Sequence, residues 1–97
     1  MNALRWSLAA ERDLRDIAEW IGDRNRDAAF RIVDRIEKSI DTLKKFPELG
    51  RPGRVDGTRE LVITGTSYLV IYEVAEAQEK IDIVRILHSA QRWPPKT

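Results

Sequence analysis

Apolar and polar positions follow two different periods along this chain. In residues 8–45 the apolar side chains recur every three or four positions, whereas from residue 60 onward they gather in three β-branched runs separated by short polar turns. The first period is typical of amphipathic helices and the second is typical of strands. Because the helices come first and the strands follow together, we predict an α+β domain in which a helical hairpin packs on one face of a small antiparallel sheet.

The helical part divides into two segments. The first is predicted over residues 8–22, with Ser7 as its N-cap, and the second from about residue 27 to residue 45. Each large apolar side chain that is buried contributes about 1.5–3 kcal/mol, so packing on the sheet rather than surface ion pairs should decide these helices. The residues that we expect in the shared core are Leu14, Ile17, Ile21, Val33, Ile36, Ile40, Leu43, Val70 and Tyr72.

The three apolar runs predict strands over residues 60–63, 68–74 and 81–87. The middle run is apolar on both alternating faces, so it should be the central strand. Between the helices and the strands, residues 46–54 hold two prolines and two glycines, which argue against a regular element there. Arg85 interrupts the last run, and it should either point into a cleft or pair with a carboxylate, for which Glu60 and Glu73 are candidates.

Length, charge and composition limit the possible functions. Ninety-seven residues are enough for one domain, and the absence of cysteine excludes disulfides and thiolate chemistry. The net charge is +1, from 17 basic and 16 acidic residues, which is a weaker basic bias than a duplex-binding protein usually shows. No apolar stretch approaches the roughly 20 residues of a membrane span, so we expect a cytoplasmic protein without membrane contact.

The candidate chemistry is sparse. His88 is the single histidine, so a multi-histidine metal site is excluded, and no glycine signature for a phosphate-bearing cofactor is present. We therefore expect neither a metal nor a cofactor. The simplest interpretation of His88 is a ring that bonds the backbone at a strand end. A nuclease in which His88 acts as acid or base, assisted by Arg85, Arg92 or Tyr72, is the alternative.

Four segments occur in an informative order: a long second helix ending in FPELGRP, then GTREL, YLVIY and RILHSAQRW. Together, over about residues 4–94, they resemble the ParE toxins of bacterial toxin–antitoxin pairs, within the ParE/RelE superfamily. The resemblance implies a β-α-α-β-β-β fold in which residues 4–6 add a strand. It also implies a ParD-like antitoxin encoded next to this protein, which would be a ribbon-helix-helix or similar dimer. Operator DNA would be contacted only through that antitoxin.

The superfamily divides by activity. RelE-like members cut messenger RNA on the ribosome, which requires an acid, a base and cations around the phosphate. The resemblance implies that these cations would come from the positions that hold Glu60, Val62 and Leu69 here, and an anion with two hydrophobes cannot clamp a phosphate. ParE-like members instead inhibit DNA gyrase by binding, so we expect a gyrase inhibitor rather than an enzyme. A ribosome-dependent endonuclease and a non-toxic antitoxin-binding relic are the alternatives.

If the protein acts by binding rather than by catalysis, arginine and aromatic side chains are the main candidates for contacts, because they are enriched at interface hot spots. Trp93 offers a large apolar area for a target, although it would serve equally well as core packed on the helices. We expect the target to contact Arg51, Arg54, Arg59, His88, Arg92 and Trp93. We expect the antitoxin to contact Arg85, Tyr68 and Tyr72.

Overall fold

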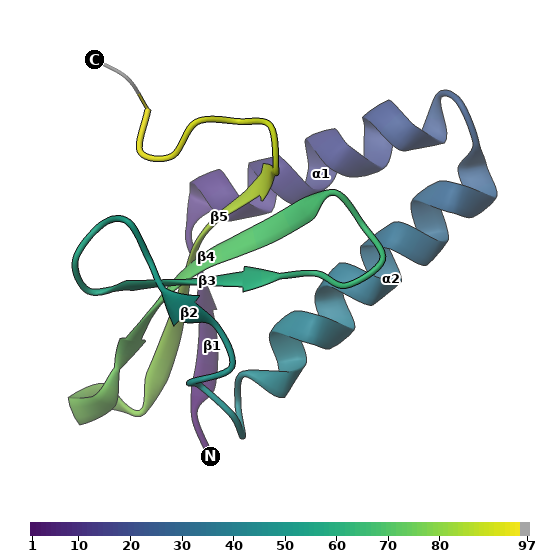
Figure 1. Ribbon diagram of the computed structural model, residues 1–97. Helices are drawn as coiled ribbons and strands as arrows, with labels where there is room; N and C mark the ends of the chain where they lie inside the picture. The colour runs from purple at the N-terminus through teal and green to yellow at the C-terminus, as the bar shows by residue number, and fades with distance from the viewer. Residues whose placement is uncertain (96–97) are drawn as a thin grey trace.

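The computed structural model describes residues 1–95 and places a helical hairpin on one face of a five-stranded sheet (Figure 1). In chain order the elements are β1 (Ala3–Trp6), α1 (Leu8–Gly22), α2 (Arg26–Thr42), β2 (Arg51–Pro52), β3 (Thr58–Val62), β4 (Tyr68–Ala75), the 3₁₀-helix η1 (Glu76–Gln78) and β5 (Lys80–His88). The strand order is β1-β5-β4-β3-β2. This confirms the predicted α+β class, the strand at the N-terminus and the central place of β4.

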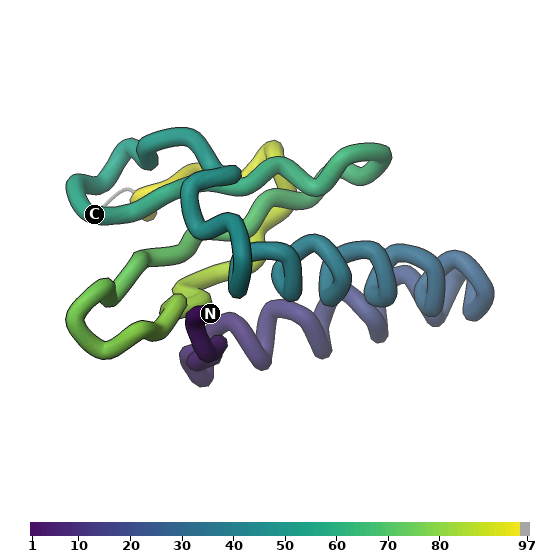
Figure 2. Tube along the Cα trace, turned by 90° about the horizontal axis from the view of Figure 1, so that it is seen from below, coloured from purple at the N-terminus to yellow at the C-terminus, as the bar shows by residue number. Residues whose placement is uncertain are grey.

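Side-chain caps set where both helices begin. The Ser7 hydroxyl accepts a hydrogen bond from the Ala10 N–H at 2.9 Å, as predicted, and the Asn25 side chain does the same for Ala28. The α2 helix ends at Thr42, earlier than predicted, because its last turn tightens into i→i+3 bonds such as the one from the Leu43 N–H to the Ile40 carbonyl. Figure 2 shows α1 and α2 side by side beneath the sheet, with the hairpin tip reaching past it.

The core lies between this hairpin and the sheet. Leu14 and Ile21 pack against the core and are partly buried. Val33 is also only partly buried, because it lies at the border of the inward face of α2 and lines a groove with Phe30 on the outside of the hairpin. The other six predicted core residues are buried: Ile17, Ile36, Ile40, Leu43, Val70 and Tyr72.

Two features of the sheet differ from the sequence prediction. The β1 strand pairs with β5 in parallel, so the sheet is mixed rather than purely antiparallel. Residues 51 and 52 form the short strand β2 inside the segment that was expected to be irregular. Pro52 is tolerated there because β2 is the edge of the sheet, where proline's missing N–H breaks no interior ladder bond.

A β-bulge in β5 changes which of its residues share a face. Tyr72 pairs with Ile83 but the preceding Ile71 pairs with Arg85, so Val84 is the extra residue. Simple alternation would place Ile83 on one face with Arg85. Instead Ile83 shares the helix-side core with Ile86. The bulge therefore keeps the helix side of β5 apolar and moves Arg85 out of it.

No helix in the described part of the chain is both long enough and apolar enough to span a membrane.

Candidate functional site

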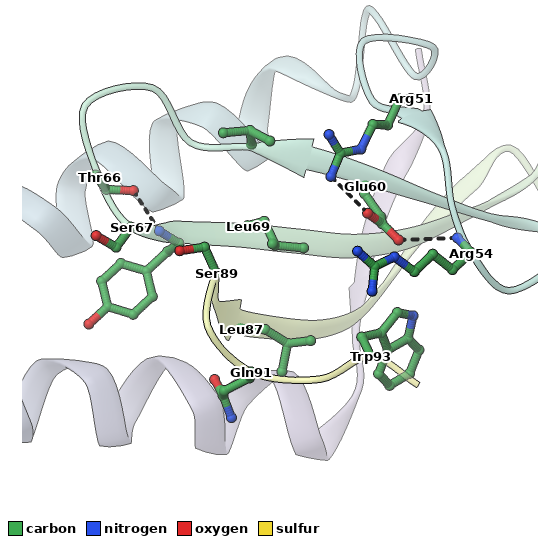
Figure 3. A pocket seen from close by; sticks show the side chains of 12 residues that line it. Arg51, Arg54, Glu60, Thr66, Ser67, Leu69, Leu87, Ser89, Gln91 and Trp93 are labelled. Atoms are coloured by element: carbon green, nitrogen blue, oxygen red, sulfur yellow. Dashed lines mark hydrogen bonds and ion pairs between the residues drawn. The ribbon is translucent and has the colours of Figure 1, made fainter. Parts of the chain in front are cut away.

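The sheet face away from the helices carries a pocket of about 170 Å³ (Figure 3). Leu69 of β4 and Leu87 of β5 lie on its apolar side. Arg51 of β2 and Arg54 of the loop that follows β2 reach it, and the segment after β5 brings Trp93 to it. The fold thus brings together the segment that follows the helices and the segment that follows the last strand. These are the two segments that we predicted from the sequence to form a target-binding surface.

Glu60 holds the arginine-bearing loop in place. Its side chain is only 6% exposed, and its two carboxylate oxygens accept hydrogen bonds from the Arg51 guanidinium and from the Arg54 backbone N–H, both at 3.1 Å. A buried carboxylate needs such donors to offset the loss of water. Arg51 is therefore neutralised by its partner, whereas the Arg54 guanidinium makes no ion pair with another residue among 1–95.

The other side of the same loop is anchored by Tyr72 and Arg59. The Tyr72 hydroxyl accepts from the Gly50 N–H at 2.9 Å and donates to the Pro47 carbonyl at 2.6 Å, while Arg59 donates to the Gly50 carbonyl at 2.6 Å. A Cβ on Gly50 would lie 2.7 Å from the Tyr72 ring, so only glycine fits. Burial raises the pKa of the Tyr72 phenol above its usual value, partly offset by the bond from Gly50.

This anchorage changes two of the sequence-based assignments. Tyr72 is 0% exposed, so it belongs to the core and presents no side chain to an antitoxin in this fold. The pairing of Arg59 with Tyr72 puts its side chain on the face opposite to that of Arg51 and Glu60, where it binds the loop rather than facing the pocket. Both were missed as loop anchors because their partners are backbone groups, which sequence does not mark.

His88 lies at the end of β5, where its ring packs edge-on against Tyr68 with centroids 5.5 Å apart. Its Nδ1 accepts the Ala90 N–H at 3.0 Å, as expected for a histidine that closes a strand. The two rings line a larger, mainly apolar cavity of about 580 Å³ that also contacts Trp20 and Ile21 of α1. His88 is therefore separated from the arginine pocket, and Tyr68 borders both.

Arg85 pairs with Asp13 of α1 and not with either of the acids suggested by the sequence. The Asp13 carboxylate accepts from Arg85 Nε and Nη2 at 2.7 and 3.0 Å and from the Ile86 N–H at 2.9 Å. This hydrogen bonding raises the pKa of the Arg85 guanidinium. Asp13 thus covers the β5 edge beyond β1, and Arg85 helps to join α1 to the sheet. In the sequence, Asp13 lies next to the apolar stripe of the first helix. This position was the one sign that its side chain faces the contact between α1 and the sheet.

The outcome for the predicted target surface is mixed. Arg51, Arg54 and Trp93 meet at one pocket, and Arg92 is exposed next to Trp93. Trp93 is half-buried on the outer sheet face rather than on the helices, and its Nε1–H is buried without a hydrogen-bond partner among residues 1–95. Arg59 and His88 lie elsewhere.

The alternative nuclease set is not assembled. The Tyr72 hydroxyl is enclosed, Arg85 is held by Asp13, and the ring of His88 bonds the backbone. In the described part of the chain, no three histidine or acidic side chains are grouped as a metal site requires. The chemistry available at the outer face is therefore a cation, a buried carboxylate, an indole and apolar strand residues.

Known proteins resemble this chain over nearly its whole length. Residues 4–93 match a family described as the ParE toxin of type II toxin-antitoxin system, parDE. The Y4kP protein of Sinorhizobium fredii is 38% identical over 91 residues, which cover 94% of this chain and 92% of that protein. Toxin RelE2 of Caulobacter vibrioides is 36% identical over 91 residues, covering 94% of this chain and 99% of the toxin.

Solved structures agree on the fold. A chain in the chromosomal ParDE toxin–antitoxin system from P. aeruginosa superimposes with a TM-score of 0.81 at 25% identity, over 91% of this chain and 96% of that one. A chain of the intact E. coli RelBE toxin–antitoxin complex superimposes with a TM-score of 0.66 at 13% identity, over 95% and 100% of the two chains. The second likeness concerns the fold alone.

Proposed function

Because the chain belongs to the ParE toxin family of type II toxin–antitoxin systems, we propose that it blocks replication by binding and inhibiting DNA gyrase. We further propose that a ParD-like antitoxin neutralises it, in keeping with the ParDE pairing of its structural neighbour from P. aeruginosa. We choose gyrase rather than messenger RNA as the target because of the residues that line the outer-face pocket.

That pocket holds Glu60, Val62 and Leu69, the positions from which the RelE-like branch would supply cations. The Glu60 carboxylate points among the arginines and neutralises one of them, which works against binding a phosphodiester. Removing a single transition-state donor typically lowers a rate by about 10²–10³, so a pocket lacking several would be a poor nuclease. Inhibition by binding has no such requirement.

The same pocket has the features of a protein-binding surface. Trp93 and Arg54 both line it, and both residue types are enriched at interface hot spots. The Trp93 Nε1–H is buried and has no hydrogen-bond partner among residues 1–95, so the indole would contribute apolar ring area to a target rather than a hydrogen bond. Glu60 anchors the backbone at Arg54 by a hydrogen bond, and such anchoring should reduce the entropy lost on binding.

Two assays on the purified protein separate the candidate functions. Loss of gyrase supercoiling with accumulation of cleaved DNA is expected. Codon-periodic cuts in ribosome-bound messenger RNA without a gyrase effect would instead establish the endonuclease. If neither effect appears while the antitoxin still binds, the chain is a non-toxic relic.

Variants then test the surface. Trp93→Ala should raise the concentration needed for half-inhibition of gyrase roughly 30-fold, the equivalent of a hot spot of about 2 kcal/mol. Arg54→Gln should raise it by a smaller factor. Arg12→Gln, which removes an exposed arginine of α1 that makes no ion pair among residues 1–95, is the matched control and should leave inhibition unchanged. Equal inhibition by Trp93→Ala and the wild type would rule out this surface.

A further inference from the structure

One short stretch of the β3 edge has no strand beside it. The Ile63 N–H bonds the Tyr68 carbonyl at 3.0 Å, so odd-numbered residues of β3 turn their backbone groups toward β4 and even-numbered ones turn outward. The outward groups of Glu60 face β2, which pairs only with residues 59 and 60. Val62 is the next outward residue, and no strand of the described chain lies opposite it.

The space next to this edge is a groove of about 350 Å³ between β3 and α2. Leu49 and Val62, which line it, are 55% and 53% exposed. Native proteins usually protect a free edge with charge, proline or a covering segment, and two exposed apolar side chains do the opposite. An apolar, unpaired edge of this kind is suited to accept an added strand.

The groove continues into a cationic channel along α2. Arg35 and Ser39 line both the apolar groove and a neighbouring one of about 490 Å³. The second groove adds Arg31 and Lys38, and the acid that lines it, Asp34, is paired with Lys38 at 2.9 Å. Arg35 is held at the edge because its guanidinium donates to the Thr64 carbonyl at 2.8 Å. The path therefore changes from apolar to positive.

We propose that an extended segment of the antitoxin adds a strand at Val62, with an apolar side chain over Leu49 and acidic residues next to Arg35 and Arg31. The proposal rests on the proposed function, because it names the antitoxin as the occupant. Backbone pairing at Val62 supplies affinity, and the unlike charges supply association rate and specificity. A second copy of this chain would bring two cationic channels together, so the charge favours an acidic partner over self-pairing.

Hydrogen exchange on the full-length toxin, free and in complex with the product of the neighbouring short reading frame, tests the site directly. The Val62 amide should exchange at least ten-fold more slowly in the complex. If a complex forms and Val62 exchanges as fast as in the free toxin, the edge proposal fails alone. If no neighbouring product binds, both the antitoxin assignment and the edge proposal fail. Protection that appears in the free toxin as its concentration rises would assign the edge to a second copy.

Affinity measurements give an independent test. Val62→Pro removes the outward N–H while leaving every β3–β4 bond, and it should weaken antitoxin binding roughly 3- to 30-fold. Val62→Thr keeps the N–H and the β-branched shape, and it is the matched control, expected within about three-fold of the wild type. Arg35→Gln should reduce the association rate and its salt dependence. Equal weakening by the proline and threonine variants would overturn the backbone pairing, whether or not the proline variant is less stable.

Discussion

Removing the Tyr72 hydroxyl should destabilise the protein far more than a single oxygen suggests. The Tyr72→Phe change keeps the buried ring but leaves the Gly50 N–H, which lies in a buried residue, and the Pro47 carbonyl without their partner. A buried donor left unsatisfied costs about 1–3 kcal/mol, whereas the half-buried carbonyl can recover a bond to water. We expect a loss of about 2 kcal/mol, which for a domain of this size lowers Tm by roughly 8–16 °C.

Urea and thermal unfolding of the isolated toxin measure this loss. Tyr68→Phe is the control, because no hydrogen bond from the Tyr68 hydroxyl to residues 1–95 is formed, and it should change stability by less than about 0.5 kcal/mol. The pKa gives a second signature. Since folding raises the Tyr72 pKa, the stabilisation is complete below about pH 10, the usual tyrosine pKa, and is lost as pH rises through the folded-state pKa. A variant as stable as the control would refute the loop-anchor role of Tyr72.

Three further changes test the contact between α1 and β5, the role of His88 and the role of the C-terminal segment. Asp13→Ala leaves Arg85 and the Ile86 N–H without their acceptor and should cost about 1–3 kcal/mol in urea unfolding, and an unchanged midpoint would mean that α1 does not depend on this contact. His88→Ala should leave most toxicity in a growth assay. If His88 were a catalytic acid or base, its loss would lower the rate of RNA cleavage about 10²–10⁴-fold. Complete loss of toxicity at unchanged stability would therefore favour the nuclease. Truncation after Ala90 removes Trp93 but no strand residue, so gyrase inhibition should fall while antitoxin binding persists, and unfolding of the truncated chain would show that Trp93 is core.

Sequence periodicity predicted most of the fold because it reports burial directly. The helical stripes and the doubly apolar β4 were visible as patterns, and Ser7 was recognisable as a cap since its partner lies three residues away. The bulge at Val84 was not, because it depends on the register in which β5 pairs with β4. The short strand β2 was missed because an edge position removes the usual objection to Pro52.

The site was harder to predict than the fold for a related reason. Arg51, Arg54 and Trp93 were chosen by residue type, and the fold does bring them together. The partners of the other cations lie far along the chain or in the backbone: Arg85 meets Asp13 across 72 positions, and Arg59 meets a carbonyl. The sequence reveals that a cation is present, but only the fold shows whether the cation is already paired with another group of the protein.

This distribution of charge is the strongest physical reason to favour a protein target over a nucleic acid. Glu60 neutralises Arg51, Asp13 neutralises Arg85, and Arg59 faces the core side. Affinity for a phosphate backbone grows with the number of unpaired cations that release counterions, so these internal pairs should make RNA binding weaker than the number of arginines suggests. Arginine and tryptophan are enriched at the hot spots of protein interfaces, and the pocket is lined by one of each, Arg54 and Trp93. If the outer face acts on gyrase in this way, inhibition should depend on these two side chains and change little between low and moderate salt, whereas binding through phosphate contacts would weaken steeply.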